Sequence, residues 1–114
     1  MADNEQFVQR HIELLLAGDL DQVMQNYQST AVLRAGDEEY RGAAAVRRHL
    51  EDALASAPSD SRLDYEIKTQ SDDQVMLIWR LFVADSPEPV MHGYDEFRFD
   101  GGRIAEQFVA IAGH

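Results

Sequence analysis

Apolar residues recur at intervals of three and four in three segments of the first half of the chain, which predicts three helices. The first begins at Asp3 or Asn4, either of which can cap it, and ends at Gly18. The second begins after the cap Asp19 and extends to residues 29–30, and the third runs from Gly42 to residue 57. The positions predicted to face the interior are Phe7, Val8, His11, Ile12 and Leu15 in the first helix, Leu20, Val23, Met24 and Tyr27 in the second, and Val46, Leu50, Ala53 and Leu54 in the third.

The rest of the chain is typical of strands. Segments 31–35, 62–70, 74–84, 90–100 and 103–112 carry strand patterns, with a polar turn at 36–39 and a hairpin turn at Gly101-Gly102. Because helices precede most strands, the pattern favours an α+β fold. Segment 74–84 is apolar on both faces apart from Gln74 and Arg80, so both faces need cover. Helices can cover one face, and we expect a second copy of the chain, in a homodimer, to cover the other.

Composition narrows the classes of partner. A chain of 114 residues suits one domain, residues 1–114, and its formal net charge of −11 disfavours nucleic acid and anionic membranes as partners. There is no cysteine, which excludes disulfides and thiolate metal sites. The polar start MADNEQ lacks a signal pattern, and no apolar run approaches the roughly 20 residues of a membrane span. We therefore expect a cytoplasmic protein without a metal site.

Three stretches resemble a known superfamily: FVQRHIELLLAGDLDQVMQNYQSTAVL, YRGAAAVRRHLEDAL and GYDEFRFDGGRIAEQ. They are similar to nuclear transport factor 2-like (NTF2-like) proteins, in particular to the branch of ketosteroid isomerases and SnoaL-like polyketide cyclases. The resemblance implies a cone-shaped, cystatin-like fold, in which three N-terminal helices pack on a curved mixed or antiparallel sheet that encloses a pocket. It implies little about function, because this fold hosts unrelated activities.

The resemblance also implies that one parity of strand residues faces the pocket. Trp79 and Tyr94 then fall on the opposite parity, where we expect aromatics of a dimer interface. From the first two helices we expect Phe7, Leu15 and Tyr27 to join the pocket. The strand residues predicted to face it are Met76, Ile78, Arg80 and Phe82 in 74–84, and Met91, Gly93, Asp95 and Phe97 in 90–100.

Candidate chemistry rests on His11 and Asp95. In ketosteroid isomerases the positions similar to these hold a catalytic Tyr and a neutral Asp, both of which donate hydrogen bonds to the substrate oxygen. Tyr27 matches a supporting Tyr of that family. The family's general-base Asp is replaced by Ala35, so the steroid mechanism is incomplete here. If His11 and Asp95 touch, the carboxylate fixes the imidazole tautomer and the pair can abstract a proton next to a carbonyl. In the SnoaL-like branch, the residue similar to Asp95 is itself the base.

Arg80 adds a further alternative. A buried Arg needs a partner, and Asp95 on the adjacent strand is the obvious one. Asp95 is then ionised and serves as base, as orienter of His11 or as counter-ion of Arg80. We expect a cofactor-independent isomerase or cyclase acting on a small apolar carbonyl compound, such as a steroid, terpenoid or polyketide intermediate. The alternatives are a small-molecule-binding protein without catalysis and an epoxide hydrolase of the same fold, whose pocket also pairs Arg with carboxylates.

Overall fold

The computed structural model describes residues 4–113, and within them the chain forms three helices and six strands. The pattern-based expectation of an α+β protein is confirmed, and strands β3 to β6 lie within one residue of the predicted bounds. The helices are α1 (Asn4–Leu16), α2 (Leu20–Met24) and α3 (Ala43–Ser56), and the strands are β1 (Tyr27–Ala35), β2 (Glu38–Arg41), β3 (Ser61–Ser71), β4 (Gln74–Val83), β5 (Met91–Asp100) and β6 (Arg103–Gly113).

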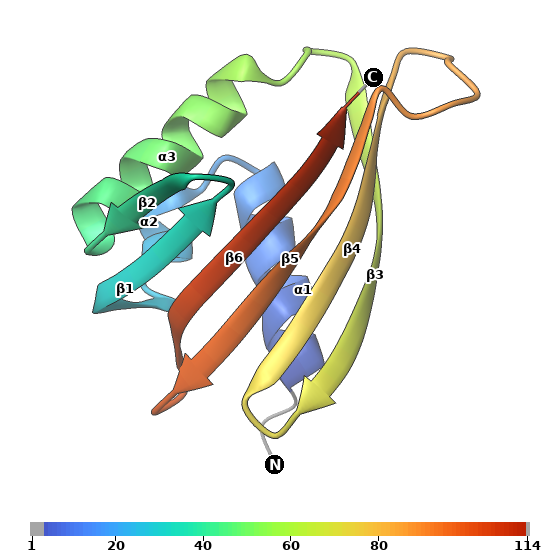
Figure 1. Cartoon of the computed structure of the whole chain (residues 1–114). Coiled ribbons are helices and arrows are strands. Elements are labelled where there is room, and N and C mark those ends of the chain that lie inside the picture. Colours follow the sequence, from blue (N-terminus) through green and yellow to red (C-terminus); the bar gives the residue numbers. More distant parts are fainter. Residues whose placement is uncertain (1–3, 114) are drawn as a thin grey trace.

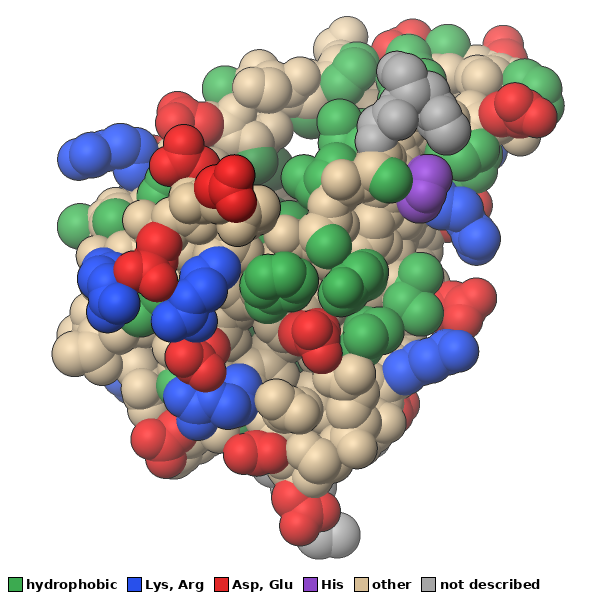
Figure 2. Space-filling model, in the orientation of Figure 1, with side chains coloured by type: hydrophobic (Ala, Val, Ile, Leu, Met, Phe, Trp, Pro, Cys, Tyr) green, Lys and Arg blue, Asp and Glu red, His purple; other side chains and the backbone are tan. Residues whose placement is uncertain are grey.

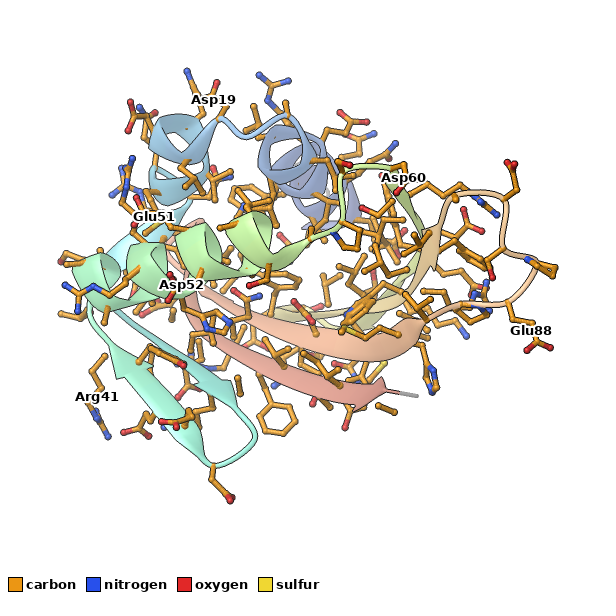
Figure 3. The ribbon with its side chains drawn as sticks, turned by 90° about the horizontal axis from the view of Figure 1, so that it is seen from above. Asp19, Arg41, Glu51, Asp52, Asp60 and Glu88 are labelled. Carbon is orange, nitrogen blue, oxygen red and sulfur yellow. The ribbon has the colours of Figure 1, made fainter. Side chains whose placement is uncertain are left out.

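The strands form one mixed sheet in the order β2-β1-β6-β5-β4-β3. Neighbouring strands are antiparallel except β1 and β6, which run parallel. The long strands bend, and α1 crosses behind β5 and β6 in Figure 1. Seen from above, the three helices lie on one side of the sheet (Figure 3). The sheet therefore has an inner face, toward the helices, and an outer face.

The segment between α2 and α3 differs from the sequence-based expectation. Helix α2 ends at Met24, so Tyr27 begins a strand instead of ending a helix, and the predicted turn at 36–39 lies partly in β2. Helix α3 thus follows a β-hairpin and is not part of an uninterrupted helical N-terminus. The cause is non-local: the backbone N–H of Ile104 donates to the carbonyl of Asn26, 2.8 Å away, and Tyr27 pairs with Ile104. Asp3, one of the two proposed caps, lies outside the described residues.

The core fills the space between the helices and the inner face. Phe7 packs against this core, since its ring lies edge-on to that of Phe99 with 5.1 Å between the ring centroids. It does not line the pocket, contrary to the expectation from the sequence. The most deeply buried side chains are Val8, His11, Val23, Leu33, Val46, Val75, Leu77, Phe97 and Ile104.

The register between β4 and β5 decides which residues face inward. Leu77 lies opposite Asp95, and Trp79 lies opposite Gly93, so odd-numbered residues of both strands share the inner face. The predicted facing was right for β5 and wrong for β4, where alternation gives no signal because both faces are apolar. The four residues of β4 that were predicted to face the pocket therefore lie on the outer face: Met76, Ile78, Arg80 and Phe82.

Gly93 leaves room for Trp79. A Cβ atom at Gly93 would lie 2.1 Å from the carbonyl oxygen of Ala110 and 2.9 Å from Cζ2 of Trp79. The first of these atoms is backbone in the adjacent strand β6, so it cannot move aside cheaply. The absent side chain thus lets the indole ring lie across β5 on the inner face.

We predict that Gly93→Ala destabilises the protein by about 1–3 kcal/mol, the usual range for overpacking, and displaces Trp79. Trp79 is the only tryptophan, so its emission spectrum reports the displacement, and urea denaturation reports the stability. Gly36→Ala is the control, because a Cβ atom there meets nothing within 4 Å and only the backbone, at φ 60°, is strained. An unchanged emission spectrum in Gly93→Ala would contradict the prediction.

Candidate functional site

A cavity of about 230 Å³ lies between the inner face of the sheet and helices α1 and α3. Its closed end is formed by buried residues such as His11 and Tyr27, and its open end by the exposed side chains of Ala53 and Ile111. Most of the lining is apolar. The lining residues are His11, Ile12, Leu15, Tyr27, Leu33, His49, Leu50, Ala53, Leu63, Leu77, Trp79, Leu81, Met91, Asp95, Phe97, Gln107, Val109 and Ile111.

Asp95 is the acidic group of the cavity wall. The indole N–H of Trp79 donates to its Oδ1 at 3.1 Å, and the amide N–H of Gln107 donates to its Oδ2 at 2.8 Å. Burial raises the pKa of Asp95 from 3.8 to about 6, although both donors act to lower it. The carboxylate is therefore fixed in position by β4 and β6, the neighbours of its own strand, and is mostly ionised at neutral pH.

His11 belongs to the same network but lies one side chain further away. Asn26 Nδ2 donates to His11 Nδ1 at 2.9 Å, so His11 Nε2 carries the hydrogen and donates to the Tyr27 hydroxyl at 3.3 Å. Tyr27 in turn donates to Oε1 of Gln107. His11 is 1% exposed, and burial lowers its pKa from 6.5 to about 4, which keeps the ring neutral.

Two expected contacts of Asp95 do not form. His11 does not touch it, since Tyr27 and Gln107 lie between them in the hydrogen-bond chain. Arg80 does not pair with it either, because Arg80 lies opposite His92 on the outer face and is exposed. The parity error in β4 explains the second mistake. The expected contact between His11 and Asp95 was wrong because similarity of two positions to those of a family does not reveal side chains that lie between them.

Sequence reasoning missed three polar residues of the wall. Trp79 was assigned to the outer face, and neither Gln107 nor His49 was considered for the pocket. Gln107 carried a usable signal, since it is a polar residue in an apolar strand on the parity of Ala105 and Val109. His49 packs its ring on Tyr40 at 4.6 Å, and burial lowers its pKa while the nearby carboxylate of Asp52 acts in the opposite sense.

Residues 4–113 contain no group of three or more acidic or histidine side chains placed to hold a metal ion. Among the same residues, no helix is both long and apolar enough to cross a membrane.

The chain belongs to the SnoaL-like domain family, whose pattern it matches over residues 8–107. No curated protein matches the chain. Among solved structures, a provisionally assigned polyketide cyclase from Sinorhizobium meliloti is 18% identical with a TM-score of 0.75, covering 91% of this chain and 93% of that one. A provisionally assigned ketosteroid isomerase from Kribbella flavida is 11% identical with a TM-score of 0.77, covering 96% of this chain and 78% of that one.

A de novo designed protein with a curved β-sheet is similar to the same degree. It is 12% identical with a TM-score of 0.80, and the match covers 98% of this chain and 88% of the design. At these identities the likeness concerns the fold, and any activity has to be argued from the site.

The two buried titratable groups predict opposite effects of pH on stability. The pKa of Asp95 is raised in the folded state, so its contribution to stability is lost as pH rises from about 4 to 6. The pKa of His11 is lowered, so its contribution grows over nearly the same range. Between pH 4 and 6.5, the free energy of unfolding of the wild type should therefore fall by on the order of 2–3 kcal/mol relative to that of Asp95→Asn. Relative to that of His11→Gln, it should rise by a similar amount.

Urea denaturation at several pH values measures both differences. Parallel pH profiles for the wild type and Asp95→Asn would show that the carboxylate titrates alike in the folded and unfolded chains, contrary to this prediction.

Proposed function

We propose that this protein is a cofactor-independent enzyme in which Asp95 removes a proton from the carbon next to a carbonyl group of a small apolar compound. The observation that supports this role is a carboxylate on the wall of an apolar cavity, with both oxygens held by side-chain N–H donors. A pKa of about 6 suits a general base, since the group is ionised at neutral pH yet still basic. Isomerases and aldol-type cyclases share this first step.

His11 acts in this proposal as a positioning residue. Its two ring nitrogens are already hydrogen-bonded and its pKa is low, so it is a poor acceptor for a substrate proton. It orients the Tyr27 hydroxyl, which orients the Gln107 amide toward Asp95. A neutral His11 thus supports the ionised form of Asp95 through two intervening side chains.

The size of the cavity narrows the substrate class. Its volume of about 230 Å³ lies below the range of roughly 300–1,000 Å³ that is typical of sites for drug-sized ligands. Among steroids, terpenoids and polyketide intermediates, we therefore favour compounds with one or two rings over four-ring steroids. Three apolar residues that were expected in the pocket also line the cavity: Leu15, Met91 and Phe97. Their side chains would contact the ring carbons of the substrate.

The alternatives are unequally supported. The epoxide hydrolase hypothesis depended on an arginine beside carboxylates, and the exposed position of Arg80 removes that support. A binding protein without catalysis remains the second candidate, because Ala35 stands where the ketosteroid isomerases carry their base. It makes the opposite prediction in the experiment that follows.

We predict that the protein exchanges the α-hydrogens of a two-ring ketone, 2-tetralone, for deuterium in D₂O faster than buffer does. Proton NMR follows the loss of the α-hydrogen signal. Asp95→Asn should slow the exchange by roughly 10²- to 10⁴-fold, the range for loss of a general base. The rate constant should fall as pH drops below about 6, because protonated Asp95 cannot accept a proton.

Glu96→Gln is the matched control, since it removes a carboxylate at the next position of β5, on the outer face. Saturable binding of the ketone with no exchange above buffer would favour the binding protein over the enzyme.

We also propose that the outer face of the sheet pairs with a second copy of the chain. Hydrophobic side chains gather there over β4, β5 and β6, with an acidic side chain among them and further charged side chains on either side (Figure 2). Glu96 lies on this face, between Met76 and Phe108 of the neighbouring strands. The rings of Tyr94 and Phe108 lie 6.3 Å apart in this area, and Phe108 is 39% exposed. Exposed apolar patches of this kind typically mark interaction sites. In this proposal Tyr94 lies in the interface, as expected, whereas Trp79 faces the cavity and does not.

We predict that Phe108→Arg converts a dimer into a monomer, because it places a charge within the apolar contact. Sedimentation velocity measures the change in mass. Val90→Arg is the control, since Val90 is 40% exposed but lies in the loop between β4 and β5. A wild-type protein that sediments as a monomer at high micromolar concentration would refute the dimer.

A further inference from the structure

His49 is a polar side chain of the cavity wall that takes no part in the network around Asp95. It belongs to α3, whereas Asp95 belongs to β5, and both side chains line the cavity. Helix α3 lies on the same side of the sheet as the other helices (Figure 3). Its ring packs on Tyr40 of β2 at an angle of 40°, and within residues 4–113 it makes no side-chain hydrogen bond. The imidazole is only partly buried, so its nitrogens are accessible.

Most other side-chain donors of the wall are engaged with one another. Trp79 and one N–H of the Gln107 amide donate to Asp95, and the Tyr27 hydroxyl donates to Gln107. The Nε2–H of His11 donates to Tyr27. Among the lining residues that the structure describes, His49 is therefore a side chain whose whole hydrogen-bonding capacity is available to a carbonyl oxygen that enters the cavity.

We propose that His49 is a second catalytic residue, whose ring N–H binds the carbonyl oxygen of the substrate while Asp95 removes the adjacent proton. This inference rests on the proposed function. In the first step the C–H bond breaks, the proton moves to the Asp95 carboxylate, and the electron pair forms the C=C bond of an enolate. The negative charge on the enolate oxygen accepts the hydrogen bond from His49. Asp95 then returns the proton to the same carbon or to a conjugated one, so no oxidant or cofactor is needed.

The surroundings of His49 suit a neutral donor. Burial lowers the pKa of the ring, and Asp52, one turn away on α3, only partly opposes this effect. The other ionisable groups of the cavity lining are His11 on α1, Tyr27 on β1 and Asp95 on β5, and Tyr40 on β2 packs against the His49 ring. A neutral imidazole donates a hydrogen bond without transferring a full proton, and a donor aimed at a developing oxyanion typically contributes a factor of 10²–10³ to kcat.

The placement of the two groups also defines the orientation of the substrate. The carbonyl oxygen points toward α3, and the carbon that loses its proton faces β5. Leu50 and Ala53 of α3, with Leu77 and Leu81 of β4, enclose the carbon skeleton between them. This geometry predicts a cyclic ketone whose reacting carbon is directly attached to the carbonyl carbon.

Infrared spectroscopy of 2-tetralone labelled with ¹³C at the carbonyl tests the contact directly. In wild-type protein and in Asp95→Asn, we expect the carbonyl band of the bound ketone to shift to lower wavenumber than in an apolar solvent. In His49→Phe, which keeps a ring to pack on Tyr40, the shift should disappear and kcat for hydrogen exchange should fall about 10²-fold or more. His92→Phe, on the outer face, is the matched control and should leave both unchanged.

A second measurement follows the ring of His49 in the wild-type protein. Nitrogen-15 NMR of the histidine rings should show one imidazole signal that shifts when the ketone binds, and the absence of this signal in His49→Gln assigns it to His49. An unshifted carbonyl band in the wild type, or the same band in His49→Phe, overturns the role of His49 whatever the exchange rate. Equal exchange rates in the wild type and Asp95→Asn overturn the proposed function even if the band shifts. Failure of the ketone to bind saturably overturns both the orientation and the substrate class.

Discussion

The structure of the pocket depends on one constraint, the burial of a carboxylate in an apolar cavity. An ionised Asp95 needs donors, since a buried charge without hydrogen bonds is costly. Trp79 and Gln107 supply them from the strands on either side of β5, and Tyr27 and His11 extend the chain of hydrogen bonds to β1 and α1. One negative charge on β5 thereby orients side chains from four other elements, which is why the polar end of the cavity is organised while the rest is apolar.

That arrangement requires a particular strand register. Trp79 reaches the carboxylate because it lies opposite Gly93, two residues from Asp95 along β5, where no side chain blocks the indole. Gln107 reaches it because β6 pairs with β5 so that Val109 lies opposite Asp95 and Gln107 opposite Phe97. A shift of one residue in either pairing would turn one of these donors to the outer face and leave one carboxylate oxygen without its partner.

The fold by itself says little about activity. Three proteins are structurally similar to this chain: one provisionally assigned as a polyketide cyclase, one provisionally assigned as a ketosteroid isomerase, and a designed protein with a curved sheet. Any activity therefore has to come from the polar groups of the cavity: a carboxylate near pKa 6 in the sheet and, on α3, an imidazole without a hydrogen bond to any described side chain. A base and a neutral donor on opposite walls of a small apolar cavity suit enolate chemistry on a compact ketone.

The sequence alone predicted α1, α3 and strands β3 to β6, because helical and strand periodicities are local properties of the chain. The resemblance to NTF2-like proteins, together with the alternation of strand residues, also placed Asp95 on the inner face. Tertiary structure decided the rest. Strand β4 is apolar on both faces, so only pairing with β5 shows that Trp79 points inward and Arg80 outward. Strand β1 begins at Tyr27 through parallel pairing with β6, more than seventy residues away, and His49 enters the pocket wall only because α3 packs over the sheet. Contacts between segments so distant in the chain leave no periodic signal in the sequence.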